Sequence, residues 1–307
     1  MSEQNGAKGF ALKGHLAMVG ANVMWGLMSP VAKLVMAAGV VSPLLMTGFR
    51  IYGAAALFWL LSMFGKRESV SRRDLLLLAG AAMLGILCNQ GCFIFGVGFT
   101  SPGEASIITT TMPMWVMVLA WLVLKEPITW KKTGGIVLGA TGALLLVLNS
   151  ANGGGLKGDN PVLGDLLVLS AQLSYALYLT LYKNFIAKYS LVTLMKWMFL
   201  FAAIAMSPVA VPAFASLDWG VIPQMHYLGV LYVVCCGTFF AYMCIMVGQK
   251  NLRPTIVGMY NYVQPIVASL VGVCLGLDRF TPVKVCAVVL IFSGVFLVTR
   301  SRAKQNS

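Results

Sequence analysis

Apolar segments long enough to cross a membrane follow one another along almost the whole chain, separated by short polar stretches. They cover residues 15–37, 42–64, 74–98, 103–124, 131–150, 161–182, 190–211, 225–249, 254–277 and 282–300. A helix that crosses the hydrocarbon core needs about 20 mostly apolar residues. The pattern therefore predicts an all-α integral membrane protein with ten transmembrane helices. No small-residue cleavage site follows the first run, so we expect a retained helix and not a signal peptide.

The composition agrees, because 59% of the 307 residues are hydrophobic and only 10% are charged. A net charge of +13 could indicate a nucleic-acid partner, but its distribution argues against one. If the N-terminus is cytoplasmic, most Lys and Arg residues fall in cytoplasmic segments, and Lys157, Arg279 and Lys284 fall on the other side. Positive charge accumulates on cytoplasmic loops. We therefore expect an inner or plasma membrane protein with both termini in the cytoplasm and no nucleic-acid partner.

Identical residues recur at a separation of 152 along the chain. The pairs include Gly85 and Gly237, Gly96 and Gly248, Pro102 and Pro254, Pro113 and Pro265, and Gly142 and Gly294. The sequence thus predicts two five-helix repeats, residues 15–150 and 161–300, with an outer linker at 151–160 and cytoplasmic tails at 1–14 and 301–307. An odd number of crossings per repeat places the copies in opposite orientations. Inverted repeats of this kind are typical of secondary transporters, whose substrate site lies near the membrane midplane between the halves.

Three stretches resemble a known family. They are "WGLMSPVAK" in the first run, "SPGEASIITTTMPMWVMVLAWLVLKEPITWKKTGGIVLGATGALLLV" in the fourth and fifth, and "RPTIVGMYNYVQPIVASLVGVCLGLDRFTPVKVCAVVLIFSGVFLV" in the last two. The chain resembles the drug/metabolite transporter superfamily in its ten-helix form with two EamA domains. The resemblance covers nearly the whole chain. It implies a carrier of amino acids, sugars, metabolites or drugs, often directed outward, with a central cavity between the halves.

A proline inside an apolar run marks the same place in each repeat. Pro113 and Pro265 cannot donate to the carbonyls of Thr109 and Asn261, so each frees a backbone acceptor in the membrane. Irregular backbone at that depth is tolerated only where it is buried in protein or faces a wet cavity. On a helix, Thr109, Thr110 and Pro113 share one face, as do Asn261, Tyr262 and Pro265. We predict that both faces line the cavity; the alternative is that they join helices by hydrogen bonds.

Other intramembrane polar and aromatic residues complete the predicted substrate site. They are Asn22, Trp25, Ser29 and Lys33 in the first helix, Asn89 and Gln90 in the third, Gln172 and Tyr175 in the sixth, and Tyr242 in the eighth. Aromatic rings beside amides suit an organic solute with an apolar body and polar ends. The alternative for each aromatic residue is packing in the core or in an interfacial belt.

Lys33 and Arg50 are ionisable residues within predicted helices. Such residues are functional candidates by default, and Lys33 shares the helix face that holds Asn22 and Ser29. Both stand near the predicted outer ends, where long side chains can also reach the interface or take a structural hydrogen bond. The sequence leaves substrate contact and these structural roles open.

The leading hypothesis is a secondary transporter that moves a small organic metabolite by alternating access, with export as the expected direction. An intramembrane enzyme would need paired carboxylates, a His-rich metal cluster or an activated nucleophile, and the sequence presents none of these patterns, nor a nucleotide-binding motif. We therefore expect no catalytic residue, no metal and no cofactor. A channel or a receptor-like scaffold is the other alternative, and the oligomeric state stays open.

Overall fold

The computed structural model describes residues 2–37, 39–65, 68–100, 105, 108–150, 160–274 and 281–301. These residues form helices and no strands. The first half contains α1 (Ser2–Ala37), α2 (Pro43–Ser62), α3 (Arg72–Ala82), the π-helical segment η1 (Met83–Cys88), α4 (Asn89–Phe99), α6 (Met112–Leu124) and α7 (Trp130–Ser150). The predicted linker 151–160 and tail 301–307 lie almost wholly outside the described residues.

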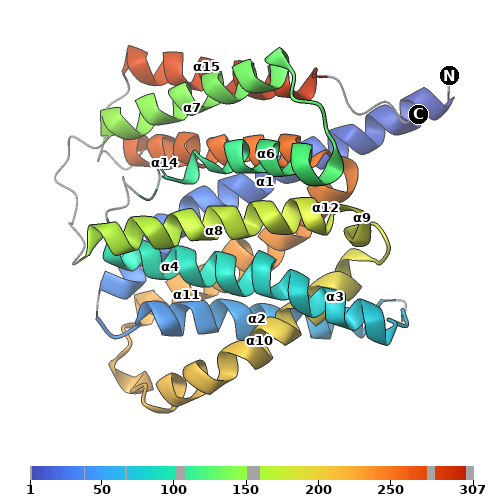
Figure 1. Ribbon diagram of the computed structural model, residues 1–307. Coiled ribbons are helices and arrows are strands. Elements are labelled where there is room, and N and C mark those ends of the chain that lie inside the picture. The colour runs from blue at the N-terminus through green and yellow to red at the C-terminus, as the bar shows by residue number, and fades with distance from the viewer. Residues whose placement is uncertain are drawn as a thin grey trace.

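The second half repeats this order. It contains α8 (Pro161–Leu181), α9 (Lys183–Ile186), α10 (Leu191–Ala215), η2 (Trp219–Val221), α11 (Gln224–Val234), the π-helical segment η3 (Cys235–Phe240), α12 (Ala241–Asn251), α13 (Pro254–Met259), the 3-10 turn η4 (Tyr260–Tyr262), α14 (Val263–Cys274) and α15 (Pro282–Thr299). Each of the ten apolar runs is therefore mostly helical where it is described. The helices lie side by side, with the start of α1 and the end of α15 on the same side of the molecule (Figure 1).

Local sequence signals set several helix ends. Ser42, Ser71 and Ser190 each stand at an N-cap and accept a hydrogen bond from the backbone N–H three residues later. Such a cap satisfies one of the N–H groups that a helix leaves unpaired at its start. Lys125 ends α6 in the left-handed region, at φ 55°. These caps fix where the chain turns between neighbouring helices.

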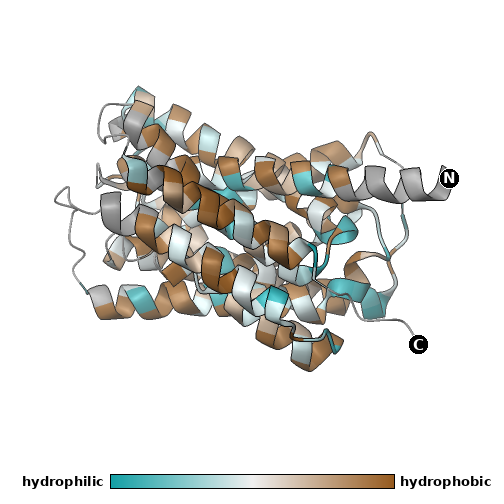
Figure 2. Ribbon diagram, turned by 90° about the horizontal axis from the view of Figure 1, so that it is seen from above, coloured by the Kyte–Doolittle hydropathy of each residue, from teal (hydrophilic) through white to brown (hydrophobic). Residues whose placement is uncertain are grey.

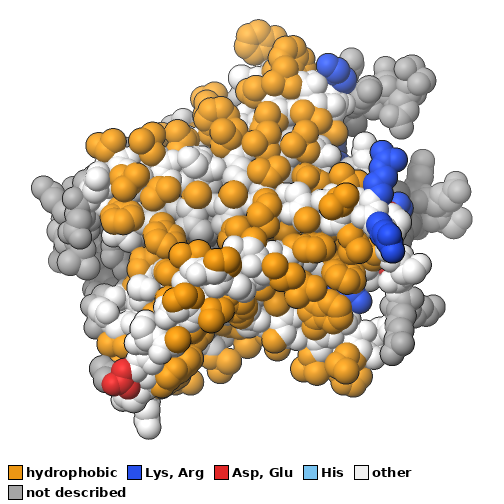
Figure 3. Space-filling model, turned by 60° about the horizontal axis from the view of Figure 1, so that its bottom comes forward, with side chains coloured by type: hydrophobic (Ala, Val, Ile, Leu, Met, Phe, Trp, Pro, Cys, Tyr) orange, Lys and Arg blue, Asp and Glu red, His pale blue; other side chains and the backbone are white. Residues whose placement is uncertain are grey.

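Among the described residues, six helical stretches are long and apolar enough to cross a membrane. They are Leu12–Met36, Pro43–Ser62, Arg72–Phe99, Val162–Leu181, Leu191–Ala215 and Gln224–Asn251, and shorter apolar helices lie at Met112–Leu124 and Val285–Thr299. Hydrophobic residues run along the helices (Figure 2) and cover most of one outer face (Figure 3). A surface of this kind is suited to lipid, so the chain is an all-α integral membrane protein. Because the other apolar helices are shorter, the total of ten membrane crossings stays a prediction.

The helices pair across the two halves. Neighbouring pairs are α7 with α15, α1 with α12, α4 with α8, and α2 with α10. Close approach of α7 and α15 depends on glycine, because a Cβ atom on Gly135 would lie 2.7 Å from the carbonyl oxygen of Gly294. Small residues allow such contacts between membrane helices.

Basic side chains gather at one end of the molecule, at the right of Figure 3. There Lys183 donates to the backbone oxygen of Leu252 at 2.7 Å, and Lys250 donates to that of Tyr189. Lys188 pairs with Asp74 of α3, and this hydrogen bond raises the pKa of Lys188. We call this region, with Lys132 and Arg253, the basic end. The opposite end holds the start of α8, where Thr100 donates to Asp165 at 2.7 Å.

Candidate functional site

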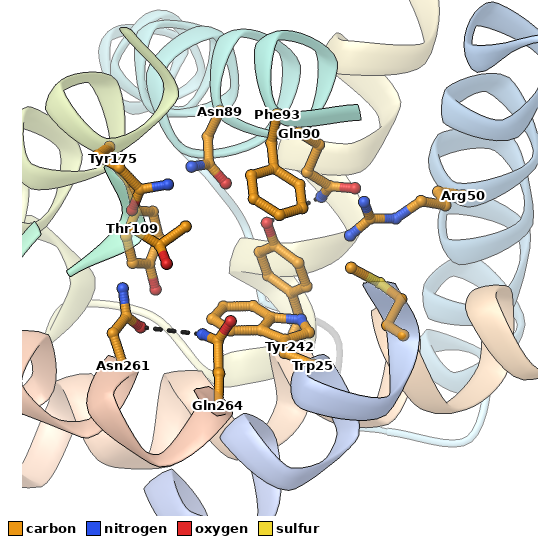
Figure 4. A pocket seen from close by; sticks show the side chains of 12 residues that line it. Trp25, Arg50, Asn89, Gln90, Phe93, Thr109, Tyr175, Tyr242, Asn261 and Gln264 are labelled. Atoms are coloured by element: carbon orange, nitrogen blue, oxygen red, sulfur yellow. Dashed lines mark hydrogen bonds between the residues drawn. The ribbon is translucent and has the colours of Figure 1, made fainter. Parts of the chain in front are cut away.

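A cavity lies between the two halves, midway along the helices. It contains about 60 Å³ that the centre of a water molecule can occupy. Its wall is formed by Trp25, Met28, Arg50, Asn89, Gln90, Phe93, Thr109, Gln172, Tyr175, Tyr242, Asn261 and Gln264. Figure 4 shows aromatic rings and amide groups turned toward one another across it. Such a mixture of apolar surface with a few polar groups is typical of sites for small organic molecules.

The structure brings together eight of the residues that the sequence predicted for the site. These eight cavity residues are Trp25, Asn89, Gln90, Thr109, Gln172, Tyr175, Tyr242 and Asn261. They come from α1, α4, α8, α12 and the two proline-containing segments. Both predicted repeats therefore contribute to the same wall.

The π-helical segments place backbone oxygens beside the cavity. In η1, Gly85 accepts a hydrogen bond from the Tyr242 hydroxyl at 3.2 Å, and in η3, Gly237 accepts one from Trp25 Nε1 at 3.0 Å. A π-helix departs from the i→i−4 pairing of an α-helix, so its carbonyls can serve side chains of other helices. The sequence prediction assigned this role to the proline segments and missed the π-helices, although the glycine pair at a spacing of 152 marked their positions.

Gln90 and Tyr242 occupy matching positions of the two halves and meet directly. Gln90 Nε2 donates to the Tyr242 hydroxyl at 2.8 Å, and this hydroxyl in turn donates to Gly85. The Gln90 amide is thereby oriented with Oε1 on its other side. Gln90 Oε1 is buried and has no hydrogen-bond partner. A buried acceptor without a partner costs free energy, so this oxygen is available to a bound molecule.

Both proline segments interrupt their helices, as the sequence predicted. Turn residues Thr110 and Thr111 precede α6, and the 3-10 turn η4 precedes α14. The expectation that each whole face lines the cavity needs correction, because Thr110, Pro113, Tyr262 and Pro265 are buried outside the wall. Tyr262 instead packs against α7, where its hydroxyl donates to the Ile136 carbonyl at 3.3 Å. The extra turn of η4 changes which side chains a helix presents to one side.

Asn22 supports the wall from behind it. This side chain is fully buried, donates to Met18 of its own helix and accepts from Gln264 Nε2 at 3.0 Å. Gln264 also donates to Asn261 Oδ1 at 3.3 Å, the bond drawn in Figure 4. The sequence pointed to the stretch that contains Gln264 but did not select it. The side chains of Ser29 and Lys33 lie outside the described residues.

Arg50 turns inward from α2. Its side chain is buried, with the residue 2% exposed, and Nε donates to the Thr238 hydroxyl of η3 at 3.1 Å. The alternative that Arg50 reaches the membrane interface is therefore wrong, and its guanidinium group lines the cavity. Met28 and Phe93 were also missed, since an apolar residue in a membrane helix carries no signal that separates a cavity from a core.

A cluster of tyrosines lies between the cavity and the basic end. Gln249 of α12 donates to the Tyr175 hydroxyl and accepts from the Tyr178 hydroxyl, each at 3.1 Å. The Tyr178 ring stacks between Tyr175 and Tyr182, with centroids 5.8 and 6.1 Å away. Lys183 then holds the backbone of Gln249. We call Tyr178, Gln249 and Lys183 the latch, because they join α8 and α9 to α12 below the cavity.

The cavity wall contains one cation, Arg50, and no carboxylate among the described residues. In the same part of the chain, no three His, Cys, Asp or Glu side chains come together to hold a metal ion. The described acidic groups at the basic end are engaged, since Glu126 binds Lys132 at 2.6 Å and Asp74 binds Lys188. The site is therefore suited to binding an organic solute through hydrogen bonds, aromatic contacts and one positive charge.

Known proteins resemble this chain over most of its length. An archaeal protein of Archaeoglobus fulgidus, named an uncharacterized transporter, is 25% identical over 85% of this chain and 90% of its own. The uncharacterized inner membrane transporter YedA of Escherichia coli (strain K12) is 27% identical over 84% of this chain and 81% of its own. One solved crystal structure shares the fold, with a TM-score of 0.74 over 95% of this chain and 96% of the other, at 16% identity.

The EamA-like transporter family matches residues 12–148 and again residues 162–300. Each match covers one of the two halves that share the cavity. The relatives are named as transporters and not as enzymes. The chain therefore belongs to the EamA-like transporter family and is a membrane transporter.

Proposed function

We propose that the protein is a secondary transporter that carries a small organic solute by alternating access. The observation that carries this proposal is the cavity between the halves, lined by residues of both and closed toward the basic end by the latch. A carrier must expose its site to one side of the membrane at a time, and inverted repeats provide two related conformations for this purpose.

Ten crossings in two inverted repeats, residues 15–150 and 161–300, are part of the proposal. Three features support it. The segments η1 and η3 begin and end 152 residues apart, which is also the separation of Gln90 and Tyr242. The contact of α1 with α12 corresponds to that of α8 with α4, as two-fold pseudosymmetry requires. An odd number of crossings in each repeat then gives the halves opposite orientations.

The cavity must widen for transport. Ligand sites for small molecules usually measure about 300–1,000 Å³, whereas this conformation leaves about 60 Å³ for water centres. Opening toward the basic end requires α8 to move away from α12, which breaks the hydrogen bonds of Gln249 with Tyr175 and Tyr178. The proposed cycle therefore alternates between this latched conformation and one in which the latch is open.

The basic end faces the cytoplasm in this proposal, together with both termini, because positive charge accumulates on cytoplasmic loops. The solute enters from the cytoplasm when the latch opens and leaves at the opposite end. The outward direction follows the resemblance to exporting members of the superfamily. Lipid surrounds the protein, and the solute is its small-molecule partner.

Counterflow in proteoliposomes tests the proposed function. Vesicles preloaded with a candidate metabolite should accumulate the labelled form of the same compound, and the rate should saturate. A channel would let label equilibrate without acceleration by internal solute, and a scaffold would give no flux. Candidate compounds can be selected by thermal shift, since a ligand that binds only the folded protein raises its stability.

A further inference from the structure

A positive charge without a counter-charge stands in the cavity wall. Arg50 is 2% exposed, and its described hydrogen bond runs from Nε to Thr238. A guanidinium group has five N–H donors, so the two terminal nitrogens retain donor capacity toward the cavity. Two ion pairs of described residues join Lys132 with Glu126 and Lys188 with Asp74, both at the basic end. No described carboxylate neutralises Arg50.

Such a charge is expensive unless something pairs with it. A buried ion without a partner destabilises a protein, and ionisable residues in a membrane interior usually face a partner or a pathway. The direction of the Arg50 side chain shows whether it faces a protein partner or the cavity. Figure 4 shows the Arg50 guanidinium group directed into the cavity, on the side where Gln90 and Phe93 lie. Among the described residues none supplies the counter-charge, and the side chain is directed toward a molecule in the cavity that could supply it.

Gln90 provides an independent sign of a binding site at the same place. Its Nε2 is fixed by Tyr242, and its Oε1 is buried without a partner. Arg50 can donate to an anion, and Gln90 Oε1 can accept from an O–H or N–H group. The rings of Trp25, Phe93 and Tyr175 form the apolar part of the wall. Together these groups match three parts of one molecule.

We propose that the site selects organic monoanions: a carboxylate binds Arg50, a neighbouring hydroxyl group donates to Gln90, and an apolar or aromatic body packs against the rings. The proposal rests on the proposed function, because it assigns the solute class of that transport site. A planar guanidinium can hold both oxygens of a carboxylate in parallel hydrogen bonds. Cationic solutes are excluded, since the wall has no described carboxylate to receive them and Arg50 repels them.

The test uses matched probes on the purified full-length protein. 3-Phenyllactate contains the carboxylate, the hydroxyl and the aromatic body; 3-phenyllactamide lacks only the charge; 3-phenylpropionate lacks only the hydroxyl. Sodium chloride serves as the inorganic anion. Dissociation constants come from the concentration dependence of the melting temperature. We expect the amide to bind at least about tenfold more weakly than 3-phenyllactate, and 3-phenylpropionate severalfold more weakly, because charge-assisted bonds contribute more than neutral ones.

Two variants test whether Arg50 causes the preference for the acid over the amide. In Arg50→Gln the difference between acid and amide should disappear, and in Arg50→Lys part of it should remain. Lys196→Gln is the matched control, because Lys196 is also a cation of a membrane helix but lies over the Trp59 ring, away from the cavity. In Lys196→Gln the preference for 3-phenyllactate over 3-phenyllactamide should be unchanged.

Several outcomes overturn the proposal. Equal binding of acid and amide, no binding of 3-phenyllactate, or a shift reproduced by chloride alone would each do so in the unmodified protein, even if Arg50→Gln does not fold. A preference for the acid that persists in folded Arg50→Gln would also overturn it. Counterflow distinguishes a failure of this inference from a failure of the proposed function. Saturable exchange of neutral or cationic solutes would support the transporter and contradict the anion site. Arg50-dependent binding of 3-phenyllactate without flux would support the anion site and contradict the carrier.

Discussion

Asn261 is the cavity residue whose side chain can be removed with the least effect on the surrounding hydrogen bonds. It is 8% exposed and lines the cavity, and its Oδ1 accepts from Gln264, which retains Asn22 as a second partner. We expect Asn261→Ala to lower the affinity for the transported solute by about fivefold or more, the value of one hydrogen bond. Stability should change little, because hydrogen bonds between membrane helices average about 0.6 kcal/mol.

Asn251→Ala provides the matched control for this measurement. Asn251 is also an amide in a membrane helix, but it donates to Val247 of its own helix near the basic end. Solute affinity from thermal shifts and counterflow should be unchanged in this variant. If Asn261→Ala unfolds the protein while Asn251→Ala does not, Asn261 holds the helices together and the sequence alternative was correct.

At the residue scale the sequence found the polar part of the wall and missed the rest. Asn89, Gln90, Gln172 and Asn261 were recognisable because amides are costly in hydrocarbon, so their presence needs a reason. Phe93 gave no such signal, since a phenylalanine in a membrane helix fits lipid, core or cavity equally well. The inward direction of Arg50 depends on Thr238, a partner 188 residues away, which no local pattern shows.

Gly85 in η1 and Gly237 in η3 occupy matching positions of the two halves, but the side chains packed against them differ. A Cβ atom on Gly85 would lie 2.8 Å from the Tyr178 ring, whereas one on Gly237 would meet the flexible Met28 side chain. Tyr178 is held by Gln249 and cannot shift easily, but methionine adapts to irregular gaps. We expect Gly85→Ala to destabilise the protein by about 1–3 kcal/mol, the usual cost of overpacking, and Gly237→Ala to cost less.

Melting temperatures in detergent can check this order. Gly91→Ala is the control, since a Cβ atom there would meet nothing within 4 Å. This variant should melt like the parent protein or slightly higher, because alanine favours helix. Equal melting temperatures for the Gly85 and Gly237 variants would show that the latch does not hold the Tyr178 ring in place.

The helices themselves were predictable from the sequence, but their rotation was not. Every apolar run is mostly helical where it is described, and serines cap several helix starts in the structure. The segments η1 and η3 and the turn η4 interrupt the regular repeat of 3.6 residues. A change of one residue turns the following helix by about 100°. This rotation explains why Tyr262 and Pro265 lie outside the wall although they share a helical face with Asn261 in the sequence.

The orientation of the whole molecule can be measured by cysteine labelling. In a variant without the seven native cysteines, single cysteines would replace Lys131, at the start of α7 near the basic end, and Gly220, in the exposed turn η2. An impermeant thiol reagent added to intact cells should label position 220 and spare position 131, if the basic end is cytoplasmic. The reverse labelling would invert the proposed topology and the direction of the cycle.

Loss of the latch should favour the conformation that is open toward the basic end. Gln249→Ala removes hydrogen bonds to Tyr175 and Tyr178, and each bond contributes about 1 kcal/mol. In the cysteine-free variant, Gln172→Cys places a thiol in the cavity wall. Labelling of this thiol in inside-out vesicles should become about five- to thirtyfold faster with Gln249→Ala.

Thr141→Ala is the control for the latch, because Thr141 is exposed and bonds only within α7 in the described contacts. Its labelling rate should equal that of the parent. An unchanged rate in Gln249→Ala would mean that the tyrosine cluster does not limit access from the basic end.

The uncompensated charge of Arg50 also has an electrical consequence. Counting the described residues of the wall, the cavity is neutral with a monoanion bound and retains one positive charge when empty. A membrane potential of 100 mV acts on one elementary charge with about 2.3 kcal/mol, if the charge crosses the whole field. Exchange of one anion for another should then be insensitive to voltage, whereas net flux, which needs the empty carrier to return, should follow a potassium diffusion potential. A cavity built around one arginine would thus favour exchange in an energised cell.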